Sequence, residues 1–203
     1  MNTGTSPVDA LNLLTILWTI VMLTQEQLKQ LIHYNPDTGV VTWLKRNTSM
    51  FTDGPVNSAQ SKCRTWNTKN AGNQVTTTNN YGYTTVNIWG KGYLAHRLAF
   101  LYMVGLIPKE VDHINGVRLD TRWCNLREVT RTQNCMNTKI RSDNTSGVVG
   151  VYWNNQFNRW ECYINKLGKR KYLGRHQNFF EAVCVRKSAE LTFGFHKNHG
   201  RAV

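Results

Sequence analysis

Four polar residues in the middle of the chain have types and a spacing that allow them to do chemistry together. Asp112 and His113 are adjacent, Asn125 follows them, and Asn134 comes nine positions later. Asp112 is a hard oxygen ligand and Asn134 offers an amide oxygen, and two such donors suit Mg²⁺, which keeps several waters and takes substrate phosphate. His113 can take a proton from water, because its ordinary pKa is near neutral pH. The alternative is a chance Asp-His dipeptide in a turn.

The flanking sequence predicts the elements that bring these side chains together. A capping-box pattern from Thr130 to Gln133 indicates the start of a helix, and Asn-Gly indicates a turn. Adjacent strand residues point to opposite faces, so Asp112 and His113 share a site only if the strand ends or twists there. The expected elements are a strand at 111–114, a turn at 115–116, a strand at 125–129 and a helix from 131 onward.

Four motifs carry a family resemblance: AHRLAF at 95–100, VDHING at 111–116, NLREVT at 125–130 and TQN at 132–134. They resemble the HNH nucleases of the ββα-metal type, most of all the phage and intron-encoded homing endonucleases. The resemblance implies a metal-dependent DNA endonuclease that leaves 5′-phosphate and 3′-hydroxyl ends.

The resemblance also implies roles for single residues. His113 matches the general base, and Asp112 and Asn134 match the ligands of one divalent ion, Mg²⁺ or Mn²⁺. Asn125 matches the residue that steadies the loop carrying the base. This chain has Asn134 where the family name implies histidine, so we expect weak metal binding and a preference against zinc.

Several other polar residues in this region have two interpretations. Arg97, Arg127 and Arg131 are candidates for phosphate contacts, with ordinary surface arginine as the alternative for the last two. His96, at the start of an apolar helix, either lies near phosphate or is a buried residue that braces the site.

The charge of the chain favours a polyanionic partner. Its 203 residues carry a net charge of +13, and the pI is near 9.8. Residues 141–203 hold eleven basic and four acidic residues, a net charge of +7, whereas residues 1–95 and 96–140 each hold seven and four, a net charge of +3. Double-stranded DNA is the expected partner, with solubility alone as the alternative.

The cysteines and the N-terminus bear on the cellular compartment. Five cysteines without a CxxC pair indicate neither a disulfide framework nor a zinc finger. The apolar run at 11–23 is too short for a typical membrane span, and we expect translation to start at Met22, with an apolar anchor as the alternative. We therefore expect a protein of the host cytoplasm with no membrane association and no obligate protein partner.

The N-terminal part resembles the small accessory module that precedes the nuclease core in this family. Residues 24–33 are predicted as a capped helix, 40–44 as a strand, and 46–74 as polar loop. A hairpin around Gly90-Lys91-Gly92 then leads into a helix at 97–104.

The C-terminal part changes in pattern and resembles the AP2 DNA-binding domain. Three strands, at 148–153, 159–165 and within 168–174, precede an amphipathic helix at 179–191 with Phe180, Ala182 and Val183 facing inward, and with Leu191 as a further candidate. In AP2 domains the exposed face of the sheet enters the major groove, which a β-sheet fits. The positions matching that face are Trp153, Arg159, Trp160, Arg170 and Tyr172, with a place in the core as the alternative for Trp160. Lys169 and Lys171 are candidates for nonspecific phosphate contact, with solvated turn lysines as the alternative. A slip of one residue in register would exchange the faces.

The sequence thus predicts an α+β protein: a ββα-metal nuclease core followed by a three-stranded antiparallel sheet with one helix. The expected divisions are an upstream extension at 1–21, an accessory module at 22–74, the nuclease core at 75–140, a linker at 141–147 and the AP2-like domain at 148–203. The alternative function is a noncatalytic AP2-like DNA-binding protein with a degenerate HNH scaffold.

Overall fold

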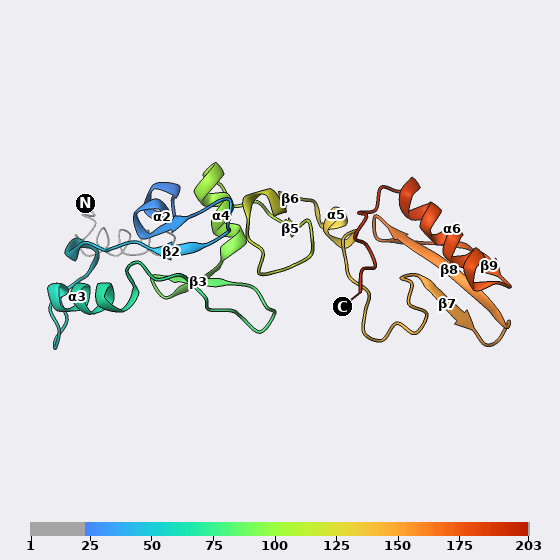
Figure 1. Ribbon diagram of the computed structural model, residues 1–203, viewed down its shortest axis with the longest axis horizontal. Coiled ribbons are helices and arrows are strands. Elements are labelled where there is room, and N and C mark those ends of the chain that lie inside the picture. The colour runs from blue at the N-terminus through green and yellow to red at the C-terminus, as the bar shows by residue number, and fades with distance from the viewer. Residues whose placement is uncertain (1–22, 203) are drawn as a thin grey trace, which may run out of the picture.

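The computed structural model of the chain describes residues 23–202. These residues form an elongated α+β molecule, in which the elements follow one another along the long axis in nearly the order of the sequence (Figure 1). No helix in this described part is both long and apolar enough to cross a bilayer. The expectations for residues 1–21, and all of the apolar run except Leu23, lie outside the described residues.

The strands form separate small antiparallel sheets rather than one large sheet. Strands β1–β2, β3–β4 and β5–β6 form two-stranded sheets, and β7–β8–β9 form a three-stranded sheet. The elements are α2 (Gln25–Leu31), β1 (Ile32–Tyr34), β2 (Val41–Trp43), η2 (Thr48–Met50), α3 (Ala59–Asn70), β3 (Thr85–Ile88), β4 (Lys91–Leu94), α4 (Ala95–Val104), β5 (Val111–His113), η3 (Trp123–Asn125), β6 (Leu126–Glu128), α5 (Arg131–Cys135), β7 (Val151–Asn154), β8 (Arg159–Lys166), β9 (Lys169–His176) and α6 (Phe179–Thr192).

Two hydrophobic cores hold these elements together. The larger core joins α2, the β1–β2 and β3–β4 hairpins and α4, with Leu28, Ile32, Val86 and Leu98 almost fully buried. The smaller core lies between the three-stranded sheet and α6, and its centre is made of Val151, Cys162 and Ala182. The C-terminal sheet and helix therefore pack around a core of their own.

Local signals predicted several of these elements correctly. The Thr24 hydroxyl accepts from the Gln27 backbone N–H, and the Gln27 side chain accepts from the Thr24 N–H, as a capping box requires. Helix α4 begins two residues earlier than expected and ends at Gly105, which has a φ of 81°. Glycine tolerates this left-handed conformation without steric cost.

The prediction of a polar loop over 46–74 was wrong, because α3 lies within it. The Ser58 side chain caps this helix by accepting from the Ser61 N–H, and the twelve residues that follow contain no glycine or proline. Cys63 is its one buried residue, and Trp66 packs edge-on against Trp43. A helix with so little buried surface leaves almost no apolar periodicity in the sequence.

The inward face of α6 also differs from the prediction. Ala182 is fully buried as expected, but Phe180 is 71% exposed and Leu191 is 83% exposed. The buried positions one and two turns beyond Ala182 are Arg186 and Glu190, which form an ion pair of 3.3 Å. Hydrophobic patterning cannot predict a face on which buried charges take the place of apolar residues.

The N-terminal module is docked on the loop that precedes β6. The Tyr34 hydroxyl donates to the Thr121 carbonyl at 2.7 Å, and the Thr121 hydroxyl donates to the Gly39 carbonyl at the same distance. Gly39 has a φ of 74°, and a β-carbon there would lie 2.5 Å from the backbone nitrogen of Arg122. Only glycine fits this approach of the two backbones.

We therefore predict that Gly39→Ala destabilises the protein more than Gly72→Ala. Both residues have left-handed backbone conformations, and alanine there costs about 1–2 kcal/mol. A β-carbon at Gly72 meets nothing within 4 Å, so Gly39→Ala should add an overpacking cost of about 1–3 kcal/mol. Free energies of unfolding in urea measure the difference, and equal decreases for the two variants would show that the docking contact does not contribute.

Candidate active site

The β5–β6 pair and α5 form a strand–strand–helix unit that carries the central polar residues. The register places Asp112 opposite Arg127 and His113 opposite Leu126. Helix α5 begins with the expected capping box between Thr130 and Gln133. His113 is the last residue of its strand, and both Asp112 and His113 line a single cleft of about 630 Å³.

The Asp112 carboxylate is buried and is held by two partners. Arg127 donates to Oδ2 from Nε at 3.0 Å and from Nη2 at 2.7 Å. The Nδ2 group of Asn137 donates to Oδ1 at 3.1 Å and to Oδ2 at 2.9 Å. A buried carboxylate needs such partners, because burial of an unpaired charge is strongly unfavourable. Arg127 thus neutralises Asp112, and its contact with phosphate stays a prediction.

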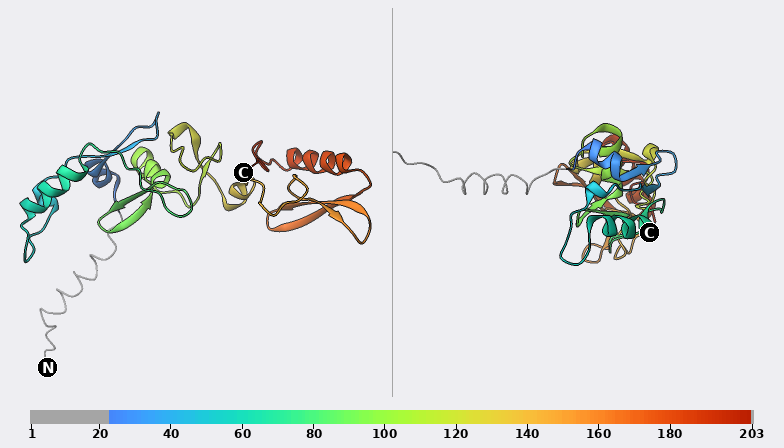
Figure 2. Two further views of the ribbon diagram at one scale, coloured as in Figure 1. Left: turned by 60° about the horizontal axis from the view of Figure 1, so that its bottom comes forward. Right: turned by 90° about the vertical axis from the view of Figure 1, so that its left-hand side faces the viewer.

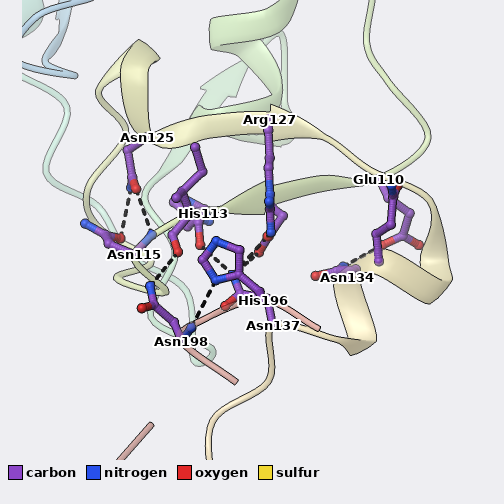
Figure 3. Close-up of polar contacts among 12 residues, drawn as sticks. Glu110, His113, Asn115, Asn125, Arg127, Asn134, Asn137, His196 and Asn198 are labelled. Carbon is purple, nitrogen blue, oxygen red and sulfur yellow. Dashed lines mark hydrogen bonds and ion pairs between the residues drawn. The ribbon is translucent and has the colours of Figure 1, made fainter. Parts of the chain in front are cut away.

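Asn134 lines the same cleft but has a different hydrogen-bond partner. Its Nδ2 donates to Oε2 of Glu110 at 2.9 Å, and no hydrogen bond among residues 23–202 joins it to Asp112. Glu110 thereby fixes the orientation of the amide, and the oxygen of Asn134 lies on the side away from Glu110, towards the other site residues (Figure 3). Arg131 extends this contact, with Nη1 3.6 Å from the Glu110 carboxylate.

His113 is buried and its Nε2 atom has no hydrogen-bond partner in the described part of the chain. Its ring lies 4.9 Å from the ring of His96 and 5.9 Å from that of Tyr83. Burial lowers the pKa of His113, although the nearby Asp112 carboxylate acts in the opposite direction. The imidazole is therefore held in its neutral form at neutral pH, with a free ring nitrogen.

His96 packs behind His113 on helix α4 and belongs to the buried side of that helix. Burial, His113 and Arg97 together lower the pKa of His96 to about 3. A neutral ring in contact with both Tyr83 and His113 fits the bracing role better than a phosphate contact. Arg97 itself donates to the Lys109 carbonyl at 3.3 Å.

Asn125 holds the turn that follows His113. Its side-chain oxygen accepts from the Asn115 backbone N–H at 2.9 Å, and its Nδ2 donates to the Asn115 side chain and to the Asp120 carbonyl. The Asn125 backbone carbonyl accepts from the Ile114 N–H at 2.8 Å. Asn125 thus fixes the backbone directly after His113 without reaching into the cleft.

Basic side chains line the cleft around these residues. Arg118, Lys139, Arg141 and Arg201 share the lining with Asp112, His113 and Asn134. Within residues 23–202, no group of three or more His, Cys, Asp and Glu side chains is placed to hold a metal ion. A cation bound here would therefore depend on amide oxygens, water and substrate phosphate in addition to Asp112.

The C-terminal sheet separates the six candidate DNA contacts into two faces. Three candidates lie on the face opposite α6: Arg159, Arg170 and Tyr172. The register pairs them with Asn154, Asn165 and Tyr163. Trp153 pairs with Trp160 and Lys171 pairs with Ile164, on the face towards α6.

Two contacts fix this assignment of the faces. The Trp160 ring lies 4.6 Å from that of Phe179, and the Lys171 ammonium group lies 5.3 Å from the Phe193 ring. Trp153, Trp160 and Lys171 therefore do not share a face with the three other candidates, and the sequence alone could not settle this register.

Sequence reasoning missed several residues that contact the site. Asn137 holds Asp112 and Glu110 holds Asn134. His196 and Asn198 come from the end of the chain (Figure 3), as does Arg201. Asn137, three positions after Asn134, lies close enough in sequence to have been suspected. The C-terminal residues lie more than 60 positions away from their partners and leave no local signal.

Comparison with known proteins defines the class of this site. The family model for the HNH endonuclease matches residues 93–136, which include α4, β5, β6 and α5. The chain therefore carries an HNH endonuclease domain.

A phage protein is similar to this chain over a longer segment. Protein 3.8 of Escherichia phage T7 is 35% identical over 82 residues, which is 39% of this chain and 67% of the phage protein. The chain belongs to the same family as that protein. No solved structure matches the chain.

The buried histidine behind the site generates a prediction about pH. Below pH 6.5 the unfolded chain binds a proton at His96, whereas the folded protein does not until about pH 3. Because the unfolded state binds more protons in this window, the contribution of His96 to the free energy of unfolding is complete above pH 6.5. It decreases as the pH falls towards 3.

We therefore expect His96→Gln to flatten this dependence. Near pH 5 the slope of the unfolding free energy against pH should decrease by about 1.4 kcal/mol per pH unit. Urea unfolding at several pH values measures the slope, and His33→Gln, at an exposed position, should retain the wild-type slope. Identical slopes for all three proteins would mean that His96 is not held neutral.

Proposed function

We propose that the protein is a metal-dependent DNA endonuclease of the HNH homing type, which hydrolyses phosphodiester bonds. The observation that carries the proposal is that Asp112 and His113 line one cleft, with the His113 Nε2 atom unpaired and basic side chains around it. The HNH family match over residues 93–136 supports the same conclusion.

The donor atoms in the cleft fit one Mg²⁺ or Mn²⁺ ion. Oδ1 of Asp112 accepts only from Asn137 in the described part of the chain, so it retains a lone pair for a cation. The Asn134 amide is fixed by Glu110 through its nitrogen, which leaves its oxygen available. Asp112 and Asn134 would hold the ion, and the ion would stabilise the charge that develops on the phosphate and the leaving oxygen. A site with few charged ligands favours Mg²⁺, because this ion keeps water and phosphate in its coordination shell.

His113 is the general base in this proposal. A histidine kept neutral by its surroundings can accept a proton from the attacking water at a ring nitrogen at the working pH. Asn125 and Asn137 position it through the backbone, because Asn137 also donates to the His113 carbonyl at 3.1 Å.

The C-terminal sheet is proposed to place the nuclease on DNA, as the AP2-like sequence pattern implies. Its open face presents Arg159, Arg170 and Tyr172, and Arg170 stacks over the Tyr163 ring at 3.9 Å. Flat aromatic and guanidinium groups on a sheet face suit contact with a DNA groove. Trp153, Trp160 and Lys171 are left out of this surface.

The alternative is a noncatalytic DNA-binding protein in which the HNH region serves as a scaffold. Both functions require DNA binding, but only the first requires cleavage that depends on a divalent cation. Nicking of supercoiled plasmid with and without Mg²⁺ separates them, and binding without any nicking would support the alternative.

We predict that His113→Ala abolishes cleavage and leaves DNA binding nearly intact. Loss of a general base costs on the order of 10² to 10⁴ in rate, whereas affinity depends mainly on phosphate contacts elsewhere. Plasmid nicking and gel-shift affinity measure the two properties, and His33→Ala is the control at an exposed histidine. Wild-type turnover by His113→Ala would remove His113 from the mechanism.

We further predict that Arg170→Ala weakens DNA binding and that Lys171→Ala does not. The two residues are neighbours on β9 with the same charge, but they lie on opposite faces of the sheet. Removal of one cation that binds a phosphate lowers the salt dependence of affinity by about 0.9 in slope. Affinity across a salt series measures this effect. Equal effects of the two variants, or a larger effect of Lys171→Ala, would reject the open face as the DNA-binding surface.

A further inference from the structure

The end of the chain returns to the nuclease unit instead of ending beside the C-terminal sheet. After α6, the segment His196–Arg201, which we call the C-terminal clasp, runs beside α5 and the turn that follows it (Figure 2). His196 donates to the Met136 carbonyl at 3.3 Å and Gly200 to the Thr138 carbonyl at 2.8 Å, and Ile140 donates back to the Arg201 carbonyl at 3.0 Å. Backbone hydrogen bonds thus fix the clasp beside the candidate active site.

Asn198 of the clasp holds the backbone that directly follows His113. Its Nδ2 donates to the Ile114 carbonyl at 2.9 Å (Figure 3). Asn125 holds the same short segment through the Ile114 and Asn115 N–H groups. The segment that follows His113 is therefore held by Asn125 of η3 and by the clasp.

Arg201 makes the contact with the greatest consequence for chemistry. Its Nη1 donates to the Asn137 carbonyl at 2.7 Å and to the Asn137 side-chain oxygen at 3.2 Å. Its guanidinium lies against Gly116, where the φ is 74° and a β-carbon would collide with it. The glycine of the motif VDHING thus makes room for an arginine that comes from the end of the chain.

The contact with Arg201 holds the oxygen end of the Asn137 amide, whose other end faces Asp112. An amide presents either its NH₂ or its oxygen, and the hydrogen-bond network decides which. Arg201 donates to the oxygen, while the Nδ2 group donates to both oxygens of Asp112 and to the His113 carbonyl. Without Arg201, nothing among the described residues donates to the Asn137 oxygen, so the amide is held from its Nδ2 side alone.

The clasp is also anchored in the sheet-and-helix unit. His199 is buried, and its Nε2 lies 3.3 Å from Nη2 of Arg186 on α6. Arg186 is itself buried, donates to the Val149 carbonyl and pairs with Glu190. One continuous chain of contacts therefore connects the C-terminal unit with Asp112.

We propose that the C-terminal clasp is part of the nuclease site and that Arg201 is a positioning residue, which orients Asn137 and through it the metal-binding carboxylate of Asp112. The role rests on the proposed nuclease function, because it concerns the same site. It also means that residues 148–192 are inserted within the nuclease unit, with both ends of the insertion joined to the site.

The test measures the affinity for Mn²⁺ as well as cleavage. The full-length protein, bound to a DNA duplex, is titrated with Mn²⁺, and electron paramagnetic resonance measures the concentration of free Mn²⁺. All proteins carry His113→Ala, which prevents cutting. Loss of a partner that orients a metal ligand typically lowers metal affinity 10- to 100-fold, and we expect a decrease of that size for Arg201→Ala. When His113 is retained, we expect Arg201→Ala to need more Mg²⁺ for nicking than the wild-type protein and to have a lower kcat, with little change in KM.

Two further variants distinguish positioning from charge. Lys197→Ala removes one positive charge from an exposed position in the same segment and should retain wild-type Mn²⁺ affinity and kcat. Arg201→Lys keeps the charge but loses the planar guanidinium that packs against Gly116, so it should recover only part of the Mn²⁺ affinity.

The outcomes separate this inference from the proposed function. Absence of nicking by the wild-type protein would overturn the nuclease proposal alone, because Mn²⁺ binding needs no cleavage. Equal Mn²⁺ affinity in Arg201→Ala and Lys197→Ala would overturn the positioning role.

Discussion

The site depends on how the buried carboxylate of Asp112 is held. A carboxylate that is removed from water must be paired, and here Arg127 supplies the charge while Asn137 supplies hydrogen bonds to both oxygens. These partners come from different elements, because Arg127 lies across the β5–β6 pair and Asn137 follows α5. The strand–strand–helix unit and the turn after α5 therefore supply both partners that hold Asp112 beside His113.

The rest of the molecule surrounds this unit from both ends of the chain. The N-terminal module docks on the loop before β6 through Tyr34 and Thr121, and so supports the strand that carries Arg127. The clasp docks on the turn after α5, where Arg201 fixes Asn137. The three-stranded sheet and the candidate active site are thus connected by the chain as well as by packing, since the chain both enters and leaves the sheet-and-helix unit beside the site.

The sequence predicted those parts of the site that depend on local patterns. The turn after His113, the second strand and the capping box at Thr130 all depend on residues close together in the chain, and all lie where they were expected. Helix α3 was missed because only Cys63 is buried on it, so it has no apolar stripe. The inward face of α6 was missed because Arg186 and Glu190 occupy positions where apolar residues would be expected.

The remaining features depend on contacts between distant residues. Strand register decides whether Trp160 lies on the open face of the sheet or towards α6, and an irregularity between Cys162 and Tyr163 shifts the pairing of β9 with β8. Arg201 and Asn137 are 64 positions apart, and no spacing rule connects them. A pattern can name candidates for chemistry, but it cannot name the partners that orient them when those partners come from the other end of the chain.

The most direct measurement is the position of the divalent ion itself. Crystals of the His113→Ala protein bound to a DNA duplex, soaked with Mn²⁺, would locate the ion by its anomalous scattering. One manganese peak beside the Asp112 carboxylate and the Asn134 amide oxygen, facing a backbone phosphate, is the expected result. A peak that involves neither residue, or DNA bound with its phosphates away from this cleft, would contradict the proposed metal site.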